Sequence, residues 1–276
     1  MFRRCFQVAL FFLPLTVFSQ EQSQQPAWYA RSFPCGSREA TEQFLLTARI
    51  VKVKDLGTGV TRPRKVALDD GKLQHNAIFK DIDERKMGVT FVEGKPEYDF
   101  KDSWKFEVAA YELDKLLGLN TVPVTVEREV DGKQGSLQIW IDDCMSDGDR
   151  RKKKLDSPDK TAWNCQLHRI NLFDNLIFNI DRNVGNLLIS PEWKIYMIDH
   201  TRAFKTTPEL RKPQDLVAFS ASLIAALGKL DNETASARCG KYLTSAEIGS
   251  LLKRRDLILK RYRTLRAEKG VKILYP

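Results

Sequence analysis

The apolar positions of this chain follow different patterns in its two halves. Between residues 45 and 141, short runs rich in β-branched residues are separated by turn signals, and one helical stripe interrupts them. Beyond residue 142, apolar residues recur mainly at helical spacing. Because short β-branched runs predict strands and spacings of three or four predict helices, the chain is expected to be α+β. A β-rich lobe should be followed by a mainly helical lobe.

The β-rich half is expected to form a small sheet that carries one helix. Trp104–Leu117 should be the helix, because its apolar residues share one face and Gly118 is a suitable stop. Residues 81–103 are charged and are expected to be irregular. The expected strands and the turns between them are 45–56, 64–68, Asp70-Gly71, 77–79, 122–130, Asp131-Gly132 and 136–141.

The helical half begins after an expected hinge near Trp140–Asp143, which divides the chain into an N-lobe at 45–141 and a C-lobe at 142–276. Its last helix should start at a capping box formed by Thr244 and Glu247. The expected elements are a helix at 160–179, strands at 187–190 and 195–198, and helices near 214–230 and 245–268.

The amino terminus has the basic, apolar and polar order of an export signal. Arg3 and Arg4 precede an apolar run at 8–18, and residues 20–25 are polar. The run of about 11 residues is well short of the roughly 20 that span a bilayer, which favours cleavage before Gln20 over an uncleaved anchor. We therefore expect a signal peptide at 1–19 and a poorly ordered segment at 20–44. The mature chain should be exported (periplasmic, secreted or in a secretory-pathway lumen) and have no transmembrane segment.

Charge and cysteine content narrow the classes of function. The formal net charge of +9 attracts anions in general. The sequence has no zinc-finger spacing, no RNP-like strand and no basic–aromatic repeat, so nucleic acid is not an expected partner. Four cysteines remain after signal removal, at Cys35, Cys144, Cys165 and Cys239. In an exported protein we expect them to form one or two structural disulfides of open connectivity, beside buried thiols.

The candidate chemistry is concentrated in residues 179–204, NIDRNVGNLLISPEWKIYMIDHTRAF. Asp181 precedes Asn186 by five positions, and Asp199 ends the next pair of strands. Phosphoryl transfer needs a carboxylate at the acceptor hydroxyl and oxygen ligands that hold a metal ion against the nucleotide phosphates. Asp181 suits the first role, and Asn186 and Asp199 suit the second, with Mg²⁺ or Mn²⁺ as the metal. Turn chemistry explains each residue singly better than it explains the set.

This spacing resembles the catalytic loop and metal-binding aspartate of the protein-kinase-like superfamily. The Asp-Arg-x-x-x-Asn form at 181–186 is similar to that of phosphatidylinositol 3- and 4-kinases and HipA-type kinases. EVAAYELDKLLGLNTVPVTVER at 107–128 and IDHTRAF at 198–204 resemble the Golgi casein kinase and four-jointed family of the secretory pathway. The chain departs at Asn186, where those Golgi kinases carry an acidic residue, and at His200, where many kinases have Phe. The resemblance implies a two-lobed kinase-like fold.

The resemblance also implies a lysine on the third strand that contacts the α- and β-phosphates and pairs with a helix glutamate. Lys80 ends the apolar run 77–79 and is the candidate, with a solvated strand-end lysine as the alternative. Glu107 is the expected partner because it flanks the apolar stripe of the helix, and Glu112 on the opposite flank is the fallback. Such a pair would orient the ammonium group rather than add much stability.

Two further places are expected to border the nucleotide. Gly57 and Gly59 stand between the first two strands, where glycines let backbone N–H groups approach phosphates. An ordinary hairpin explains a lone G-x-G nearly as well. Trp140 and Ile141 lie at the expected hinge, where they either border an adenine ring or pack in the core.

The expected function is transfer of the γ-phosphoryl group of ATP to a hydroxyl of a protein, lipid or small molecule. The alternatives are a transferase that moves AMP and a pseudokinase that binds a partner without turnover. The complete set of Lys80, Asp181, Asn186 and Asp199 argues against the pseudokinase. No Ala-Pro-Glu sequence follows Phe204, so the peptide-docking platform of ordinary protein kinases is not expected and the acceptor stays open.

Overall fold

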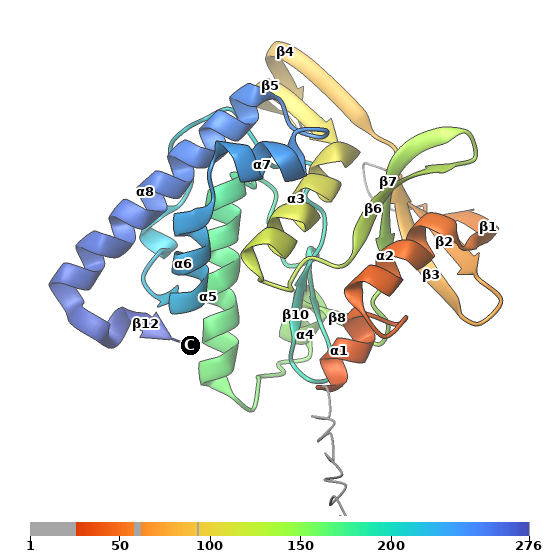
Figure 1. The fold of residues 1–276 in the computed structure, drawn as a ribbon, viewed down its shortest axis with the longest axis horizontal. Coiled ribbons are helices and arrows are strands. Elements are labelled where there is room, and N and C mark those ends of the chain that lie inside the picture. The colour runs from red at the N-terminus through yellow and green to blue at the C-terminus, as the bar shows by residue number, and fades with distance from the viewer. Residues whose placement is uncertain (1–25, 58–61, 93, 276) are drawn as a thin grey trace, which may run out of the picture.

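In the computed structural model, residues 26–57, 62–92 and 94–275 are described, and they form a sheet-rich lobe and a helical lobe (Figure 1). The expected signal peptide at 1–19 and the expected phosphate-loop residue Gly59 lie outside these residues. Within the described part of the chain, none of the helices has the length and apolar character that a membrane crossing requires.

A five-stranded antiparallel sheet in the order β1-β2-β3-β7-β6 forms the first lobe. Its strands are β1 (Arg49–Asp55), β2 (Arg64–Asp69), β3 (Gln74–Lys80), β6 (Thr125–Val130) and β7 (Lys133–Ile139). The predicted turn at Asp131 and Gly132 is present, and both residues have the positive φ (51° and 75°) that a tight two-residue turn needs. Alternation along β3 buries Ala77 and Phe79 and places Lys80 at the strand end.

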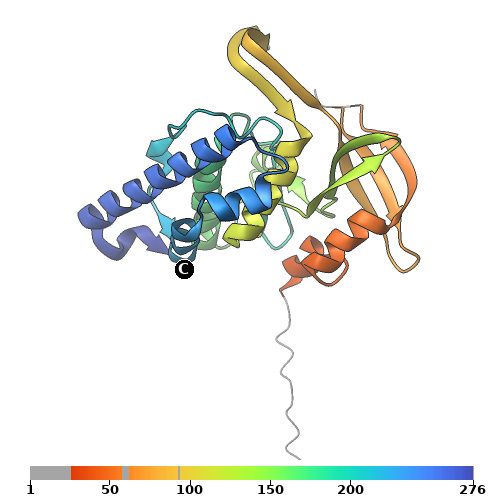
Figure 2. The same cartoon turned by 45° about the horizontal axis from the view of Figure 1, so that its top comes forward.

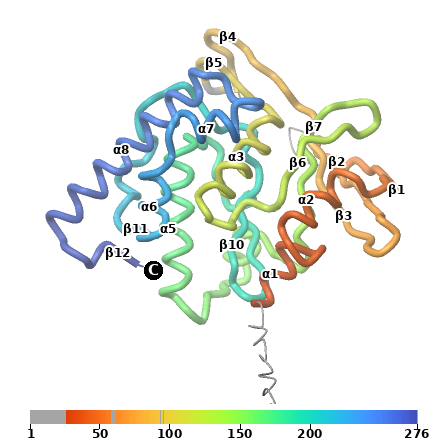
Figure 3. The backbone as a smooth tube through the Cα atoms, viewed as in Figure 1, coloured from red at the N-terminus to blue at the C-terminus, as the bar shows by residue number. Residues whose placement is uncertain are grey.

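Helix α3 (Trp104–Leu117) lies between the sheet and the helical lobe (Figures 1 and 3). Its predicted bounds are confirmed, because Ser103 accepts a hydrogen bond from the N–H of Lys105 at the start and Gly118 has a φ of 68° at the end. The N–H of Ser103 also donates to the carbonyl of Thr201 at 3.0 Å. The ring of Phe106 lies 5.6 Å from that of Phe204, so α3 is fastened to the second lobe as well as to the sheet.

The second lobe is mainly helical, as expected. Its elements are β8 (Met145–Ser146), α4 (Asp147–Lys152), α5 (Lys160–Ile177), β9 (Leu187–Ile189), β10 (Ile195–Met197), β11 (Phe219–Ser220), α6 (Ala221–Lys229), α7 (Asn232–Cys239), α8 (Ser245–Lys269), β12 (Leu274–Tyr275) and two 3₁₀ turns (Pro213–Asp215 and Gly270–Ile273). The capping box of Thr244 and Glu247 is confirmed at the start of α8. The single helix expected near 214–230 is wrong, because Phe219–Ser220 pairs with β12 in extended conformation and α6 begins only afterwards.

Residues 81–103, expected to be irregular, instead form a long hairpin of β4 (Asp83–Val92) and β5 (Lys95–Ser103). The hairpin extends beyond the five-stranded sheet (Figure 2), and Glu97 of β5 pairs with Arg202 and Lys205 of the second lobe. Most of β4 is exposed on both faces, so the strand has no buried side to impose an apolar alternation on its sequence. At its base, Nζ of Lys101 lies 2.6 Å from Oε1 of the fully buried Glu247, which ties the hairpin to α8.

The described part of the segment at 20–44 is not poorly ordered, contrary to expectation. It forms α1 (Ala27–Ser32) and the start of α2 (Arg38–Thr47), and the strand expected from Leu45 begins only at Arg49. Ser37 caps α2 by accepting a hydrogen bond from the N–H of Ala40. Phe33, Phe44 and Leu45 are buried in the main core, and this anchoring orders a segment whose composition is otherwise polar.

Helix α1 also reaches Asp142 and Asp143, which follow the last strand of the sheet and belong to the segment expected to be a hinge. Arg31 donates to the carbonyl of Asp142 at 2.8 Å, and it forms ion pairs with Asp143 and with Glu192 in the β9–β10 turn. The hydroxyl groups of Ser32 and Tyr196, on α1 and β10, are 2.9 Å apart. The N-terminal helix is therefore attached to the hinge and to the second lobe together.

The expected disulfides are not found among the described cysteines: Cys35, Cys144, Cys165 and Cys239 are all unpaired. Cys239 is the last residue of α7, and its Sγ atom lies 3.8 Å from the carbonyl oxygen of Ala109 on α3. Burial raises the pKa of both Cys144 and Cys239 to about 12. These thiols stay protonated near neutral pH and are poor nucleophiles.

Candidate active site

A cleft of about 950 Å³ lies between the sheet, the hairpin and the second lobe. Part of its lining is apolar, from Leu56, Ile78, Ile139, Leu188 and Ile198, together with Trp140 and Ile141 from the expected hinge. Another part is polar and includes Lys80, Asp181, Asp199, Thr201 and Arg202. A cleft with both kinds of lining can hold a ligand that combines an apolar ring with a charged group.

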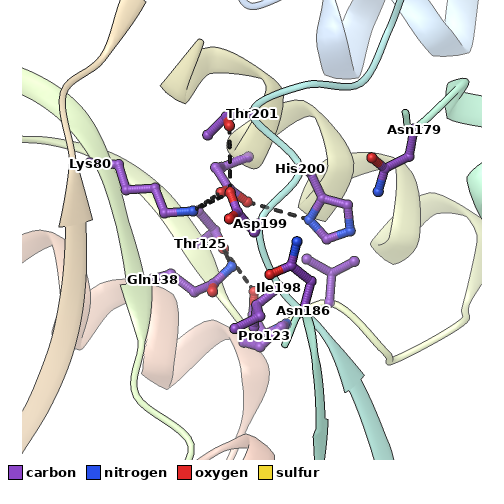
Figure 4. A network of polar contacts seen from close by, with 12 residues as sticks. Lys80, Pro123, Thr125, Gln138, Asn179, Asn186, Ile198, Asp199, His200 and Thr201 are labelled. Atoms are coloured by element: carbon purple, nitrogen blue, oxygen red, sulfur yellow. Dashed lines mark hydrogen bonds and ion pairs between the residues drawn. The ribbon is translucent and has the colours of Figure 1, made fainter. Parts of the chain in front are cut away.

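Lys80 is held between two carboxylates. Its Nζ atom donates to Oε1 of Glu107 at 2.5 Å and to Oδ1 of Asp199 at 2.8 Å, and Figure 4 shows it directed at Asp199. Burial alone would lower the pKa of Lys80, but the two carboxylates outweigh burial and raise that pKa above its usual value. The expected pair of Lys80 with Glu107 is therefore present. Glu112, the alternative partner considered from the sequence, instead has its Oε2 atom 3.8 Å from Nη1 of Arg238.

Glu107 is buried behind the cleft, and both of its carboxylate oxygens have partners. Oε1 accepts from Lys80, and Oε2 lies 3.3 Å from Nδ1 of His200. Burial favours a raised pKa for Glu107, but the Lys80 charge and the His200 hydrogen bond hold this pKa well below its usual range. Glu107 is thus an ionised carboxylate of fixed orientation.

The loop from Asn179 to Asn186 follows α5 and is shaped by its own asparagine side chains. Oδ1 of Asn179 accepts from the N–H of Asp181 at 3.0 Å, and Nδ2 of Asn186 donates to the carbonyl of Asp181 at 3.0 Å. Such local side-chain bonds explain why asparagine recurs in this turn. They leave the side chain of Asp181 on the wall of the cleft, while Asn186 is nearly buried beneath it.

Asp199 follows β10 in a left-handed backbone conformation, with a φ of 62°. This conformation is uncommon for a residue with a side chain, and residues that keep it are concentrated at functional sites. The N–H of Ile198 donates to the carbonyl of Asn186 at 3.2 Å, which joins the loop to the end of β10. The carboxylate of Asp199 is 31% exposed and faces the cleft.

Asn186 and Asp199 offer oxygen ligands of the kind that Mg²⁺ and Mn²⁺ prefer. In the described ranges, no group of three or more His, Cys, Asp or Glu side chains is arranged to hold a metal ion. A site of two protein ligands suits a cation that takes its other oxygens from phosphate and water.

Of the other described residues expected to border the nucleotide, Trp140 and Ile141 lie in the cleft and Gly57 does not. Trp140 and Ile141 line the cleft, and Nζ of Lys65 lies 4.2 Å from the centre of the Trp140 ring. Gly57 has a φ of 65° and follows Leu56, which lines the cleft, but Gly57 itself is not part of the lining.

Sequence reasoning missed the wall that the β4–β5 hairpin gives to the cleft. Phe91, Pro96 and Glu97 belong to the lining, and Glu97 forms ion pairs with Arg202 and Lys205 beyond Asp199. Gly94 is the sequence feature that could have indicated this hairpin, because it lies between the two strands and glycine is typical of hairpin loops.

Comparison with known proteins identifies the fold of the chain. No family model matches the chain. It is 28% identical over 208 residues to Protein Rv2133c of Mycobacterium tuberculosis, covering 60% of this chain and 72% of that protein. The structure of hydra Fam20 with sugar superposes with a TM-score of 0.63 at 16% identity, covering 86% of this chain and 91% of that one. The chain has an atypical protein-kinase-like fold of the Fam20 type.

A second solved structure, the Golgi casein kinase, agrees with this fold. It gives a TM-score of 0.60 at 16% identity and covers 86% of this chain and 78% of its own. The Golgi casein kinase with Mn/ADP bound gives 0.58, again at 16% identity, over 85% of this chain and 77% of its own. The α+β, two-lobed kinase-like fold expected from the sequence is confirmed.

Proposed function

We propose that the chain is a kinase that transfers the γ-phosphoryl group of ATP to a hydroxyl of its acceptor. The observation that carries this proposal is the contact of Lys80 with both Glu107 and Asp199 at a cleft that Asp181 also lines. Phosphoryl transfer depends on positioned charge more than on covalent chemistry, and this arrangement supplies a fixed ammonium group beside two carboxylates.

The roles follow from the chemistry of each group. The Lys80 ammonium contacts the α- and β-phosphates, and the Asp181 carboxylate orients the acceptor hydroxyl and accepts its proton. Asn186 and Asp199 would hold Mg²⁺ or Mn²⁺, which when bound neutralises charge on the phosphate oxygens. Trp140 and Ile141, which line the cleft, border the base.

The similar structures support a nucleotide and a divalent metal as ligands. One of them is described as a Golgi casein kinase with Mn/ADP bound, which is a statement about that protein. The likeness, at 16% identity, is one of fold, so the residues of this cleft and the assay below carry the functional argument.

Label transfer from ATP tests the proposal. The full chain is incubated with ATP labelled at the α- or the γ-phosphorus, with Mg²⁺, with Mn²⁺ or with EDTA, and with candidate hydroxyl acceptors. We expect label to move from the γ-position only, to require the metal and to be lost in Asp181→Asn. Transfer from the α-position would indicate AMP transfer. Binding of ATP without transfer of either label would indicate a pseudokinase.

We also infer that the mature chain is exported. Residues 1–19 carry the order of basic, apolar and polar segments on which this inference rests.

A further inference from the structure

Arg182, the residue after Asp181, links several segments of the second lobe through hydrogen bonds of its side chain. It donates to both carboxylate oxygens of Asp174, at 2.9 and 3.1 Å, and to the carbonyls of Asn186 and Ile198, at 2.9 and 2.8 Å. Its Nη2 atom also lies 2.9 Å from Nε2 of His200. These five contacts use all five N–H groups that an arginine side chain has.

The contact with Arg182 determines which nitrogen of His200 carries the proton. A guanidinium group donates and cannot accept, so Nε2 of His200 must be the acceptor. In a neutral imidazole the proton is then on Nδ1, where it faces Oε2 of Glu107 at 3.3 Å. His200 is fully buried and its ring meets that of Phe173 edge to face, which prevents it from turning to other partners.

A continuous line of contacts therefore crosses the boundary between the lobes. It runs from Arg182 on the catalytic loop through His200 to Glu107 on α3, and from Glu107 to Lys80 on β3. Figure 4 shows His200 beside Asp199, Asn186 and Ile198. Each member is mostly or fully buried, so water competes little for these hydrogen bonds.

We propose that His200 is a positioning residue, which holds the Glu107 carboxylate so that Lys80 stays aligned with the catalytic loop of Asp181. The proposal rests on the kinase function proposed above. The N–H of His200 occupies one oxygen of Glu107, which leaves the other oxygen directed at Lys80. Arg182 holds His200 in the tautomer that can do this. His200 touches neither acceptor nor nucleotide, and it acts through Glu107.

Three substitutions separate the two hydrogen bonds of His200. In His200→Asn the amide takes the place of Nδ1 and can still donate to Glu107, whereas in His200→Gln the amide reaches the place of Nε2 and can contact only Arg182. His200→Phe keeps the ring shape and removes both bonds. His168→Phe is the matched control, because His168 lies on α5 and packs near Tyr275, outside the cleft.

Steady-state kinetics of the full chain with ATP then test the proposal. We expect His200→Phe and His200→Gln to lower kcat by about tenfold or more, the scale of one hydrogen bond to a charged group, with a much smaller change in KM for ATP. His200→Asn should recover most of kcat, and His168→Phe should match the wild type. Equal kcat in all four variants, with only a lower thermal midpoint for the His200 variants, would overturn the proposal. Better recovery by Gln than by Asn would also overturn it.

Nitrogen NMR keeps this test apart from the test of the kinase function. The chain has three histidines, so labelling with ¹⁵N-histidine gives few signals, and His200→Asn identifies those of His200. We expect the proton on Nδ1 and none on Nε2. The reverse tautomer would overturn the positioning role even in an active enzyme. A wild type that transfers no phosphate but has the expected tautomer would overturn the kinase function and not the His200 geometry.

Discussion

The ammonium group of Lys80 and the carboxylate of Glu107 meet at 2.5 Å, although the two residues belong to different elements, β3 and α3. Glu107 is almost fully shielded from solvent and Lys80 is mostly so, at 3% and 11% side-chain exposure. Because the pair sits at the edge of the cleft, its effect is expected mainly in catalysis.

Substitution of either member of this pair should disable the same positioned charge. We expect Lys80→Ala and Glu107→Ala each to lower kcat by roughly a hundredfold, the scale of losing one preorganised group. The double variant should cost little more than either single one, because both changes misplace one ammonium group. Glu112→Ala is the internal control and should keep wild-type activity. Losses that add in the double variant would contradict the shared role.

Asp199 and Asp181 should separate nucleotide binding from turnover. Asp199→Ala removes a proposed metal ligand, so metal-dependent binding of ATP should be lost. Asp181→Ala should bind ATP with Mg²⁺ nearly as the wild type does, yet give no product. Calorimetric titration with ATP and Mg²⁺, beside product assays, measures both quantities. Equal loss of binding in the two variants would show that the roles are misassigned.

Acid should weaken the fold partly through Glu107, whose pKa is held below its usual range. Above pH about 4.3 the carboxylate is ionised in the folded and the unfolded chain, and the ion pair contributes fully. Below that pH the unfolded chain takes up a proton first, so the free energy of unfolding falls by up to about 1.4 kcal/mol per pH unit.

Urea unfolding at pH 5, 4 and 3 measures this slope. Glu107→Gln should reduce the slope of the free energy of unfolding against pH by up to the contribution of one proton, about 1.4 kcal/mol per pH unit. Glu112→Gln should not flatten it, since burial raises the pKa of Glu112 rather than lowering it. A slope unchanged in Glu107→Gln would mean that this pair does not contribute to acid unfolding.

Export should remove the first 19 residues of the chain. Cleavage before Gln20 is expected from the sequence, and the intact mass of protein recovered from the exported fraction measures it directly. A mass that still includes Met1–Ser19 would refute cleavage, and its absence from that fraction would refute export.

Elements with a local sequence cause could be predicted from the sequence. Helix α3 has its predicted bounds because it carries an apolar stripe and is flanked by a capping serine, Ser103, and a stop glycine, Gly118. The spacing of Asp181, Asn186 and Asp199 likewise reflects one loop and one strand pair. These features need no knowledge of distant partners.

The elements that were missed owe their order to distant partners. The β4–β5 hairpin is exposed on most of β4, and its anchor, Glu247, is 146 residues from Lys101. Helix α2 is ordered by burial of Phe44 and Leu45 in a core that later segments complete. The contact of His200 with Glu107 joins residues 93 positions apart, and no local pattern announces it.

The attachment of α1 to the hinge has a consequence for exchange of ligands. In two-lobed enzymes, opening of the cleft and release of product often limit turnover. Here Arg31 braces Asp142, Asp143 and Glu192 from outside the cleft, and Ser32 fastens the same helix to β10. Any rotation that parts the lobes must stretch this brace or carry α1 with it. The ion pairs of Arg31 and the hydrogen bond of Ser32 would therefore add to the free energy that separating the lobes requires.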